Sequence, residues 1–381
     1  MLIWFAILIP VVVIPFLKLF FPRRIVWWEI FVPLVVSLVL IALCKFSSVA
    51  VQTADTEYWG GWLTDAKYFE SWDERVSCRH TKYRSETYTD GEGRIQIRQV
   101  PDGHQHFYDV DDHPADWEAS DSNGAVIRIT YERFEELCRR FGNRTFVDLR
   151  RNYHFNDGDM YLTTWDRREE TLVPVVSKHF YENRVQAQTA GEFSFPAVDP
   201  KAFGLFEYPD ITNTYECPSV LGDAGPLSAD ACRQLDVINA EYGKKYQIRV
   251  WVLIFRNKSS EAGTAQKNYW KGGNKNELVI TVGVNDNHEV QWSQTFSWTD
   301  RKNFVSEANS FVANQEGDQL DLKSVAGMLK EKIPGRWQRK EFAAFSYLTV
   351  EPSAWMIVMT FILVGLATFG TAYWTVKNNI N

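Results

Sequence analysis

Three long apolar segments, residues 2–21, 25–44 and 355–376, dominate the hydrophobic pattern of the chain. Each has about 20 residues, the length that an α-helix needs to cross the hydrocarbon core of a bilayer. Because backbone groups in lipid must bond to one another, we predict three transmembrane helices. A cleaved signal peptide is the alternative for the first segment, but that segment lacks a basic N-terminal region and a small-residue cleavage site.

The first half of the chain between these segments has strand-like patterns. Ile95 and Ile97 alternate with polar neighbours, which is typical of a half-buried strand. One amphipathic helix is expected over residues 131–141, where a threonine precedes the apolar stripe and a glycine follows it. We therefore predict a β-rich, aromatic module over residues 47–215.

The second half, residues 216–335, alternates helical stripes with continuously apolar runs. Such runs are typical of strands buried on both faces, so the pattern predicts a three-layer α/β sandwich. The expected elements, in chain order, are a helix after Ser228 ended by Gly243, a strand at 248–255, a polar loop at 256–273, strands at 278–284 and 289–296 that form a hairpin, a helix after Thr299, and a helix at 322–333.

Charge differs between the apolar ends and the rest of the chain. Residues 1–46 and 354–381 carry a net charge of +4, whereas the 307 residues between them carry −11. Nucleic-acid binding needs concentrated Lys and Arg, so an acidic central part without a basic run argues against a nucleic-acid partner.

The basic residues of the ends also predict an orientation. Arg23 and Arg24 lie in the turn of the helical hairpin at residues 1–46, and Lys377 follows the third segment. Basic residues in short loops stay in the cytoplasm, which places residues 47–353 outside. Three basic residues on the domain side favour the opposite orientation: Lys45, Arg339 and Lys340.

The last part of the chain, residues 336–381, is interpreted as a connector followed by the last transmembrane helix.

Four of the five cysteines lie in the central part: Cys78, Cys138, Cys217 and Cys232. An even number in an exported domain permits two disulfides. Cys217 and Cys232 bracket a short loop that contains proline and glycine, and they are the favoured pair. Buried free thiols are the alternative.

Residues 218–333 resemble the TPM domain family. The resemblance rests on the motif Ala224-Gly225-Pro226-Leu227-Ser228 and on the order of the elements that follow it. It implies an exported α/β module tethered by a transmembrane helix. Some members of that family are described as acid phosphatases or as binding divalent metal, and others act as accessory subunits of membrane complexes. Where the family has an Asp before its first motif this chain has Gly222, with Asp223 one residue late. Where the family often has Asp-Asn-Gly, residues 275–277 are Lys-Asn-Glu.

A cluster of histidines suggests a metal site. His104 and His106 are two residues apart, so on a strand both rings would face one side. With His80 or Asp109 they could bind one divalent ion, zinc for an imidazole-rich set and calcium for a carboxylate-rich one. A solvated polar loop is the alternative reading.

The apolar segments contain two candidate features for assembly. Glu29 is a carboxylate inside a predicted span, which favours a role in an ion path or a helix contact, although an interfacial ion pair with Arg24 is also open. The third segment carries the small residues Gly365, Ala367 and Gly370, which allow close helix packing, against another copy or against the first two helices.

The sequence therefore predicts a membrane-anchored α+β protein with three transmembrane helices, a β-rich module and a TPM-like α/β module. The expected function is binding or assembly at the membrane surface, as an accessory or scaffold protein. The expected partners are the lipid bilayer and either the protein itself, as a homo-oligomer, or another membrane protein. Two alternatives are a metal-dependent hydrolase of the phosphatase type and an oligomeric channel component, the latter disfavoured by the scarcity of polar residues in the spans.

Overall fold

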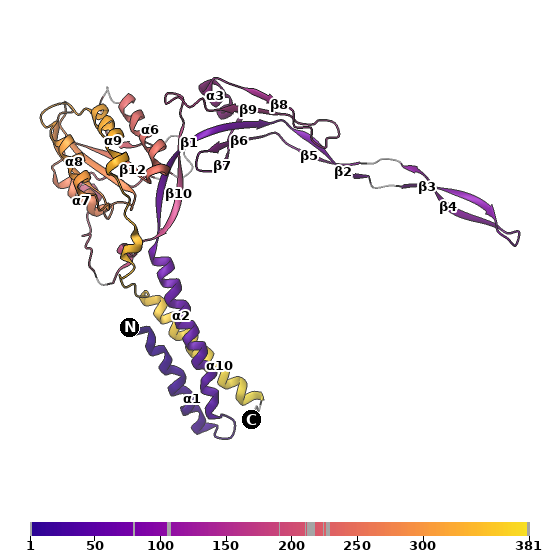
Figure 1. Cartoon of the computed structure of the whole chain (residues 1–381). Coiled ribbons are helices and arrows are strands. Elements are labelled where there is room, and N and C mark those ends of the chain that lie inside the picture. The colour runs from indigo at the N-terminus through magenta and orange to yellow at the C-terminus, as the bar shows by residue number, and fades with distance from the viewer. Residues whose placement is uncertain are drawn as a thin grey trace.

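The computed structural model describes residues 2–78, 81–104, 108–189, 191–209, 211, 218–223, 225 and 229–378. The fold mixes helices and strands, as predicted. Figure 1 shows a bundle of helices at one end, an α/β unit beyond it, and a long β-structure that extends sideways.

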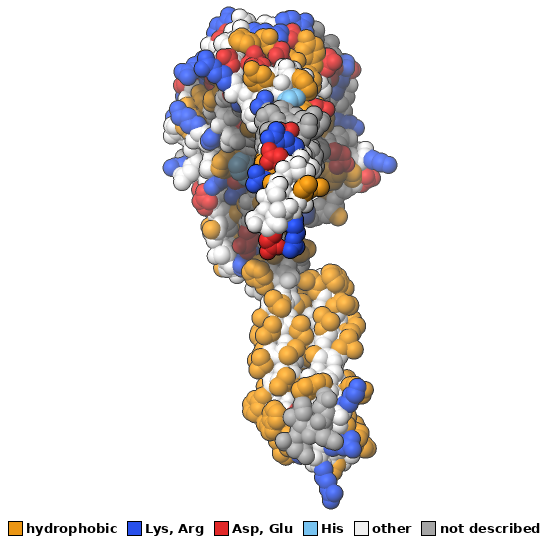
Figure 2. All heavy atoms as spheres, turned by 90° about the vertical axis from the view of Figure 1, so that its right-hand side faces the viewer, with side chains coloured by type: hydrophobic (Ala, Val, Ile, Leu, Met, Phe, Trp, Pro, Cys, Tyr) orange, Lys and Arg blue, Asp and Glu red, His pale blue; other side chains and the backbone are white. Residues whose placement is uncertain are grey.

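Three helices of the bundle are long and apolar enough to cross a membrane. They are η1 (Leu2–Ile7) with α1 (Leu8–Phe20), η2 (Trp27–Ile30) with α2 (Phe31–Thr53), and α10 (Ala354–Asn378). Ile3, Ile41 and Val364, one from each helix, are fully buried together. Figure 2 shows hydrophobic side chains over the visible face of the bundle and basic side chains at its far end.

The second helix extends beyond its predicted end at Cys44. It continues to Thr53, where the chain passes directly into strand β1 (Ala54–Phe69). The added turns are polar enough to lie outside an apolar core, and they contact the segment just before α10. Gln52 donates a hydrogen bond of 3.1 Å to the Glu351 carbonyl oxygen.

The β-rich module is organised around the long strand β1. The first half of β1 pairs with β10 (Pro174–Glu182), and the second half pairs with two other strands. The sheet has the order β7 (Val126–Arg128), β6 (Asp116–Asp121), β1, β9 (Met160–Thr164) and β8 (Thr145–Val147). Helix α3 (Tyr131–Phe141) covers it and buries Phe134 and Leu137 against Leu63 and Ala66.

An arm of two successive two-stranded ribbons projects from this sheet. The ribbon next to the sheet pairs β2 (Trp72–Cys78) with β5 (Tyr108–His113), and the distal ribbon pairs β3 (Thr81–Thr89) with β4 (Ile95–His104). Figure 1 shows the arm extending away from the rest of the molecule.

The α/β unit has helices on both faces of a four-stranded sheet. The strand order is β11 (Val220–Leu221), β12 (Arg249–Arg256), β13 (Glu277–Val284) and β14 (Val290–Phe296), of which the first three are parallel and β14 is antiparallel. One face is covered by α6 (Ala229–Tyr246), α8 (Lys302–Ala313) and α9 (Leu322–Arg336). The other is covered by α7 (Glu261–Tyr269) and by the chain at and after α5 (Pro200–Phe203). The short helices α4 (Arg184–Ala187) and η3 (Phe342–Phe345) pack together near the bundle.

Two sequence predictions in this unit were wrong. Part of the predicted polar loop at 256–273 is helix α7, because its small residues Ala262 and Ala265 are buried on the sheet. Its polar residue Gln266 is also buried, where it exchanges hydrogen bonds with the Phe206 backbone. Gly243 does not end α6, which continues to Tyr246. Gly243 is needed instead for a close packing contact, because it lies directly against Gly60 of β1.

Candidate functional site

The distal ribbon of the arm has two different faces. Residues that pair directly across two strands lie on the same face, and successive residues alternate. In the register of β3 with β4, Ile95 lies opposite Thr89 and Ile97 opposite Thr87. The residues of this face are uncharged: Tyr83, Ser85, Thr87, Thr89, Ile95, Ile97, Gln99 and Pro101. We call it the uncharged arm face.

The opposite face of the ribbon is charged and internally paired. Glu86 accepts hydrogen bonds from Arg98 at 3.2 Å and from Arg84 at 2.9 Å. The strand pattern at Ile95 and Ile97 was predicted correctly, but the half-buried environment was not. These side chains are 77% and 68% exposed, because no element of the described chain forms a second layer on this face of the ribbon. The sequence pattern therefore marks an apolar face without showing what covers it.

A groove follows β14 between α7 and α8. It consists of two adjoining cavities of about 450 and 520 Å³ that share Lys267, Thr295, Phe296 and Val305. β14 is the last strand in the described order of this sheet, so its outer edge forms the floor of what we call the β14 groove.

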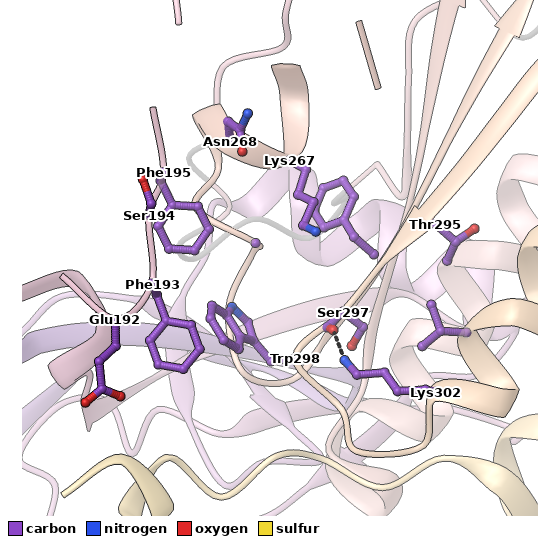
Figure 3. A pocket seen from close by; sticks show the side chains of 13 residues that line it. Glu192, Phe193, Ser194, Phe195, Lys267, Asn268, Thr295, Ser297, Trp298 and Lys302 are labelled. Atoms are coloured by element: carbon purple, nitrogen blue, oxygen red, sulfur yellow. Dashed lines mark hydrogen bonds between the residues drawn. The ribbon is translucent and has the colours of Figure 1, made fainter. Parts of the chain in front are cut away.

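Two lysines enter the β14 groove from its opposite walls. Lys267 comes from α7 and Lys302 from α8, and Figure 3 shows both reaching toward the same space. The Lys302 ammonium donates a hydrogen bond of 3.0 Å to the Ser297 carbonyl oxygen. Partial burial lowers the pKa of Lys302, and the positive charges of Lys267 and Lys340 add to this effect while Asp300 opposes it.

Aromatic side chains close one end of the groove. Phe193 and Phe195 pack edge-on against Trp298, with ring centroids 5.5 and 6.1 Å apart (Figure 3). Trp298 is fixed in turn by a hydrogen bond from its indole N–H to the Gly273 carbonyl oxygen. The site therefore combines an apolar pocket, two cations and a strand edge.

A polar cluster lies at the carboxyl ends of the parallel strands, where α/β sheets commonly bind ligands. Asp223 follows β11 and contacts Arg256 at 3.2 Å and His288 at 3.3 Å. Arg256 also contacts Asp286 at 3.2 Å, after β13. The pKa of Asp223 lies below its ordinary value. The main cause is the hydrogen bond that its carboxylate accepts from the Gly225 N–H, and the second is its hydrogen bond with His288. If the hydrolase alternative used this cluster, its carboxylates Asp223 and Asp286 would first have to be released from cationic side chains.

The predicted metal site cannot be placed. His80 and His106, and the side chains of His104 and Asp109, lie outside the described residues. Sequence reasoning missed a different group within the described chain: Asp148, Asp157 and Asp159 hold carboxylate oxygens within 4.8 Å of one another. Two of the three bind neighbouring groups of the same loop, because Asp148 pairs with Arg150 at 3.2 Å and Asp159 accepts from the Leu149 N–H.

The Lys-Asn-Glu sequence at residues 275–277, where the resemblance to TPM domains leads us to expect Asp-Asn-Gly, forms a buried junction. Lys275 lies 3.4 Å from Glu57 of β1, and the Asn276 amide donates to the Tyr58 carbonyl oxygen at 2.8 Å. Glu277 is fully buried and accepts from the Trp251 indole at 3.0 Å, and burial raises the pKa of its carboxyl. Lys275 and Asn276 therefore join the sheet to β1, whereas Glu277 bonds within the α/β unit. Lys275 also lines a small cavity of about 210 Å³ next to Tyr181.

Glu29 lies inside the helical bundle. It is 3% exposed, and its Oε1 accepts from the Val26 N–H at 3.1 Å rather than from Arg24. Its Oε2 has no hydrogen-bond partner among the described residues. Glu29 lines a cavity of about 340 Å³ together with Trp28 and Thr375.

The small residues of α10 do not form its contact with the other two helices. That contact uses a different stripe of buried residues: Thr360, Val364, Thr368, Ala372 and Thr375. Side chains added at Gly365 or Gly370 would meet nothing within 4 Å, and Ala367 is only half-buried. These positions therefore remain open toward the surroundings of the bundle.

The proposed disulfide stays a prediction, because Cys217 lies outside the described residues. Cys232 is half-buried against the core of the α/β unit, and Cys138 is half-buried on α3.

Comparisons of the chain with protein-family models, with curated proteins and with solved structures found no match. Function is therefore inferred from the geometry of this chain. Of the predicted site residues, those of the bundle can be placed and those of the histidine cluster cannot. Neither the β14 groove nor the uncharged arm face has a sequence motif; both result from strand order and pairing.

Proposed function

We propose that this is an integral membrane protein whose large extracytoplasmic domain binds a partner through the uncharged arm face. The role is that of an accessory or scaffold protein in an assembly at the membrane surface. The partner is another copy of the chain or another membrane protein. The resemblance to TPM domains, some of which are accessory subunits of membrane complexes, agrees with this role.

The observation that supports the proposal is the two-sided distal ribbon of the arm. An isolated two-stranded ribbon is marginally stable in water, since it cannot bury enough apolar surface by itself. Exposed apolar patches rimmed by polar residues mark interaction sites. Here Ile95, Ile97 and Tyr83 are more than half exposed on one face, while the other face carries its own ion pairs. A protein that covers the first face would complete the missing layer.

Anchoring at both ends favours such an assembly. The domain leaves the bundle through α2 and returns to it through α10, which restricts its orientation. Restricted partners lose less rotational freedom on association, so lateral contacts form at a lower entropic cost. The open positions Gly365 and Gly370 offer an additional contact surface within the bundle.

The first test compares two substitutions of neighbouring residues. Ile97→Glu puts a charge on the uncharged arm face and should weaken association at least tenfold, because an unpaired charge is costly to bury. Gln96→Glu should have little effect, because residue 96 lies on the charged face. Size-exclusion chromatography with light scattering, on protein extracted in mild detergent, gives the protein mass of the particle once the detergent contribution is subtracted. The proposal predicts a wild-type protein mass above the 44.1 kDa of one chain, from a second copy or from a bound membrane protein; a wild type with the protein mass of one chain would contradict it.

One feature supports an extracytoplasmic domain. The turn between α1 and η2 and the end of α10 carry the basic residues Arg23, Arg24 and Lys377, and Figure 2 places basic side chains at that end of the bundle. Basic residues in short loops stay in the cytoplasm, so this end of the bundle is assigned to the cytoplasmic side.

The orientation can be tested by cysteine labelling in intact cells. The Asp286 side chain is 76% exposed on the turn between β13 and β14. In an Asp286→Cys variant, a maleimide that cannot cross membranes should add label beyond the wild-type background without lysis. An Arg24→Cys variant should add label only after lysis. The reverse pattern would place the domain in the cytoplasm.

A further inference from the structure

The β14 groove has the outer edge of a strand as its floor. Among the described strands β14 pairs only with β13. At Val290 the outer edge is already occupied, because the Val290 N–H donates to the Asp318 carbonyl oxygen and its C=O accepts from the Gly317 N–H. From Gln291 onward, alternate backbone N–H and C=O groups of this edge are directed into the groove. Edge strands of this kind accept an extended segment from another protein as an additional strand. The part of β14 after Val290, residues 291–296, is long enough to pair with a short extended segment.

The charges of the groove are not balanced. The Lys267 side chain forms no hydrogen bond or ion pair with any described residue. Lys302 is held by the Ser297 carbonyl oxygen and pairs with no carboxylate of the described chain, because the nearby Asp300 is occupied by Lys340. Partial burial and the neighbouring lysines already disfavour the charged form of Lys302, so an incoming carboxylate would relieve that cost.

We infer that the β14 groove binds an extended, acidic segment of a partner protein, which pairs with β14 as an added strand. Successive side chains of a strand point to opposite faces. Lys267 and Lys302 project from opposite walls, so the segment needs one carboxylate for each wall, at an odd spacing in its sequence. The pocket formed by Phe193, Phe195 and Trp298 takes an apolar side chain at the end of the segment.

This site is separate from the uncharged arm face and does not depend on it. It predicts a specific chemistry for a partner: carboxylates at positions such as i and i+1 or i and i+3, a flanking apolar residue, and no proline at the paired positions. Inorganic anions would satisfy the lysines, but they would make no use of the strand edge.

The test begins with a random octapeptide library displayed on phage. Selection uses full-length protein in detergent micelles, with counter-selection on the Lys267→Glu/Lys302→Glu variant. Enriched peptides should carry Asp or Glu at odd spacing. For a synthetic peptide of the enriched sequence, Lys267→Gln/Lys302→Gln should weaken binding at least tenfold. The matched Lys201→Gln/Lys323→Gln variant, which changes two exposed lysines elsewhere, should bind as the wild type does.

N-methylation of each peptide backbone nitrogen in turn separates strand addition from charge attraction. Loss of binding at every second position supports the added strand, because only alternate N–H groups face β14. Uniform tolerance of N-methylation would overturn the inference and leave a simple anion site. So would failure to enrich acidic peptides, or binding that survives neutralisation of both lysines. The Ile97→Glu arm variant should bind the peptide normally, which keeps this result independent of the proposed function.

Discussion

Replacing Glu57 by glutamine is expected to lower the free energy of unfolding by about 3–5 kcal/mol, the usual cost of removing one member of a buried ion pair. The Glu57 side chain is only 4% exposed and lies 2.8 Å from Arg339 and 3.4 Å from Lys275. Arg339 retains Glu341 as a partner, but Lys275 loses its only carboxylate in the described chain. An uncompensated ammonium then remains in a site from which water is largely excluded.

The loss is best measured by denaturant unfolding of the full-length protein in micelles, followed by tryptophan fluorescence. Glu169→Gln serves as the control, because both side chains of its pair with Lys330 are about half exposed, and the pair should contribute less than about 1 kcal/mol. The variant that combines Glu57→Leu, Lys275→Met and Arg339→Met should recover much of the stability, since no unpaired charge is left. A loss below about 1 kcal/mol for Glu57→Gln would mean that water solvates the cluster.

Elements whose signals are local were predicted correctly. Helix α3 begins where the Thr130 hydroxyl accepts from the Arg133 N–H at 3.3 Å, and it ends at Gly142, whose φ of 75° suits glycine. Both signals lie within four residues of the helix they bound. The three apolar helices were found for a similar reason, because length and composition determine whether a segment can span a bilayer.

Features that depend on distant residues were not predictable from periodicity. Glu57 and Lys275 meet across more than 200 positions of sequence, so neither residue signals the pair. Gly243 looks like a helix end until β1 is placed beside it. The β14 groove depends on the strand order, which leaves β14 at the edge of the sheet. It also depends on helix α7, which we predicted to be a loop because its sequence is polar. The alternation of Ile95 and Ile97 with polar residues correctly predicted a strand with one apolar face. It could not show whether the residues that cover this face belong to the same chain or to a partner.

The contact between Gly60 and Gly243 predicts the second large effect. A Cβ atom at residue 243 would lie 2.3 Å from the Gly60 nitrogen, and one at residue 60 would lie 1.9 Å from the Asn239 carbonyl oxygen. These neighbours are backbone atoms, so no side-chain rotation can relieve the overlap. Gly243→Ala should therefore force β1 and α6 apart and lower the free energy of unfolding by about 3 kcal/mol, at the upper end for overpacked sites. The substitution should destabilise both parts of the domain, because β1 belongs to the sheet of the β-rich module and also packs against the α/β unit.

Helix α9 provides a control of opposite sign. Gly327 lies inside that helix, and a Cβ atom there would meet nothing within 4 Å. Alanine is favoured over glycine in a helix interior by roughly 0.5–1 kcal/mol, so Gly327→Ala should stabilise the protein by about that amount. The same substitution thus has opposite expected effects in two helices of one unit, and the difference comes from the approach of β1 alone. If Gly243→Ala also stabilised the protein in denaturant unfolding, β1 would not pack against α6 at this point. The α/β unit would then have to be held on β1 by the Glu57 cluster and the contacts around Tyr58.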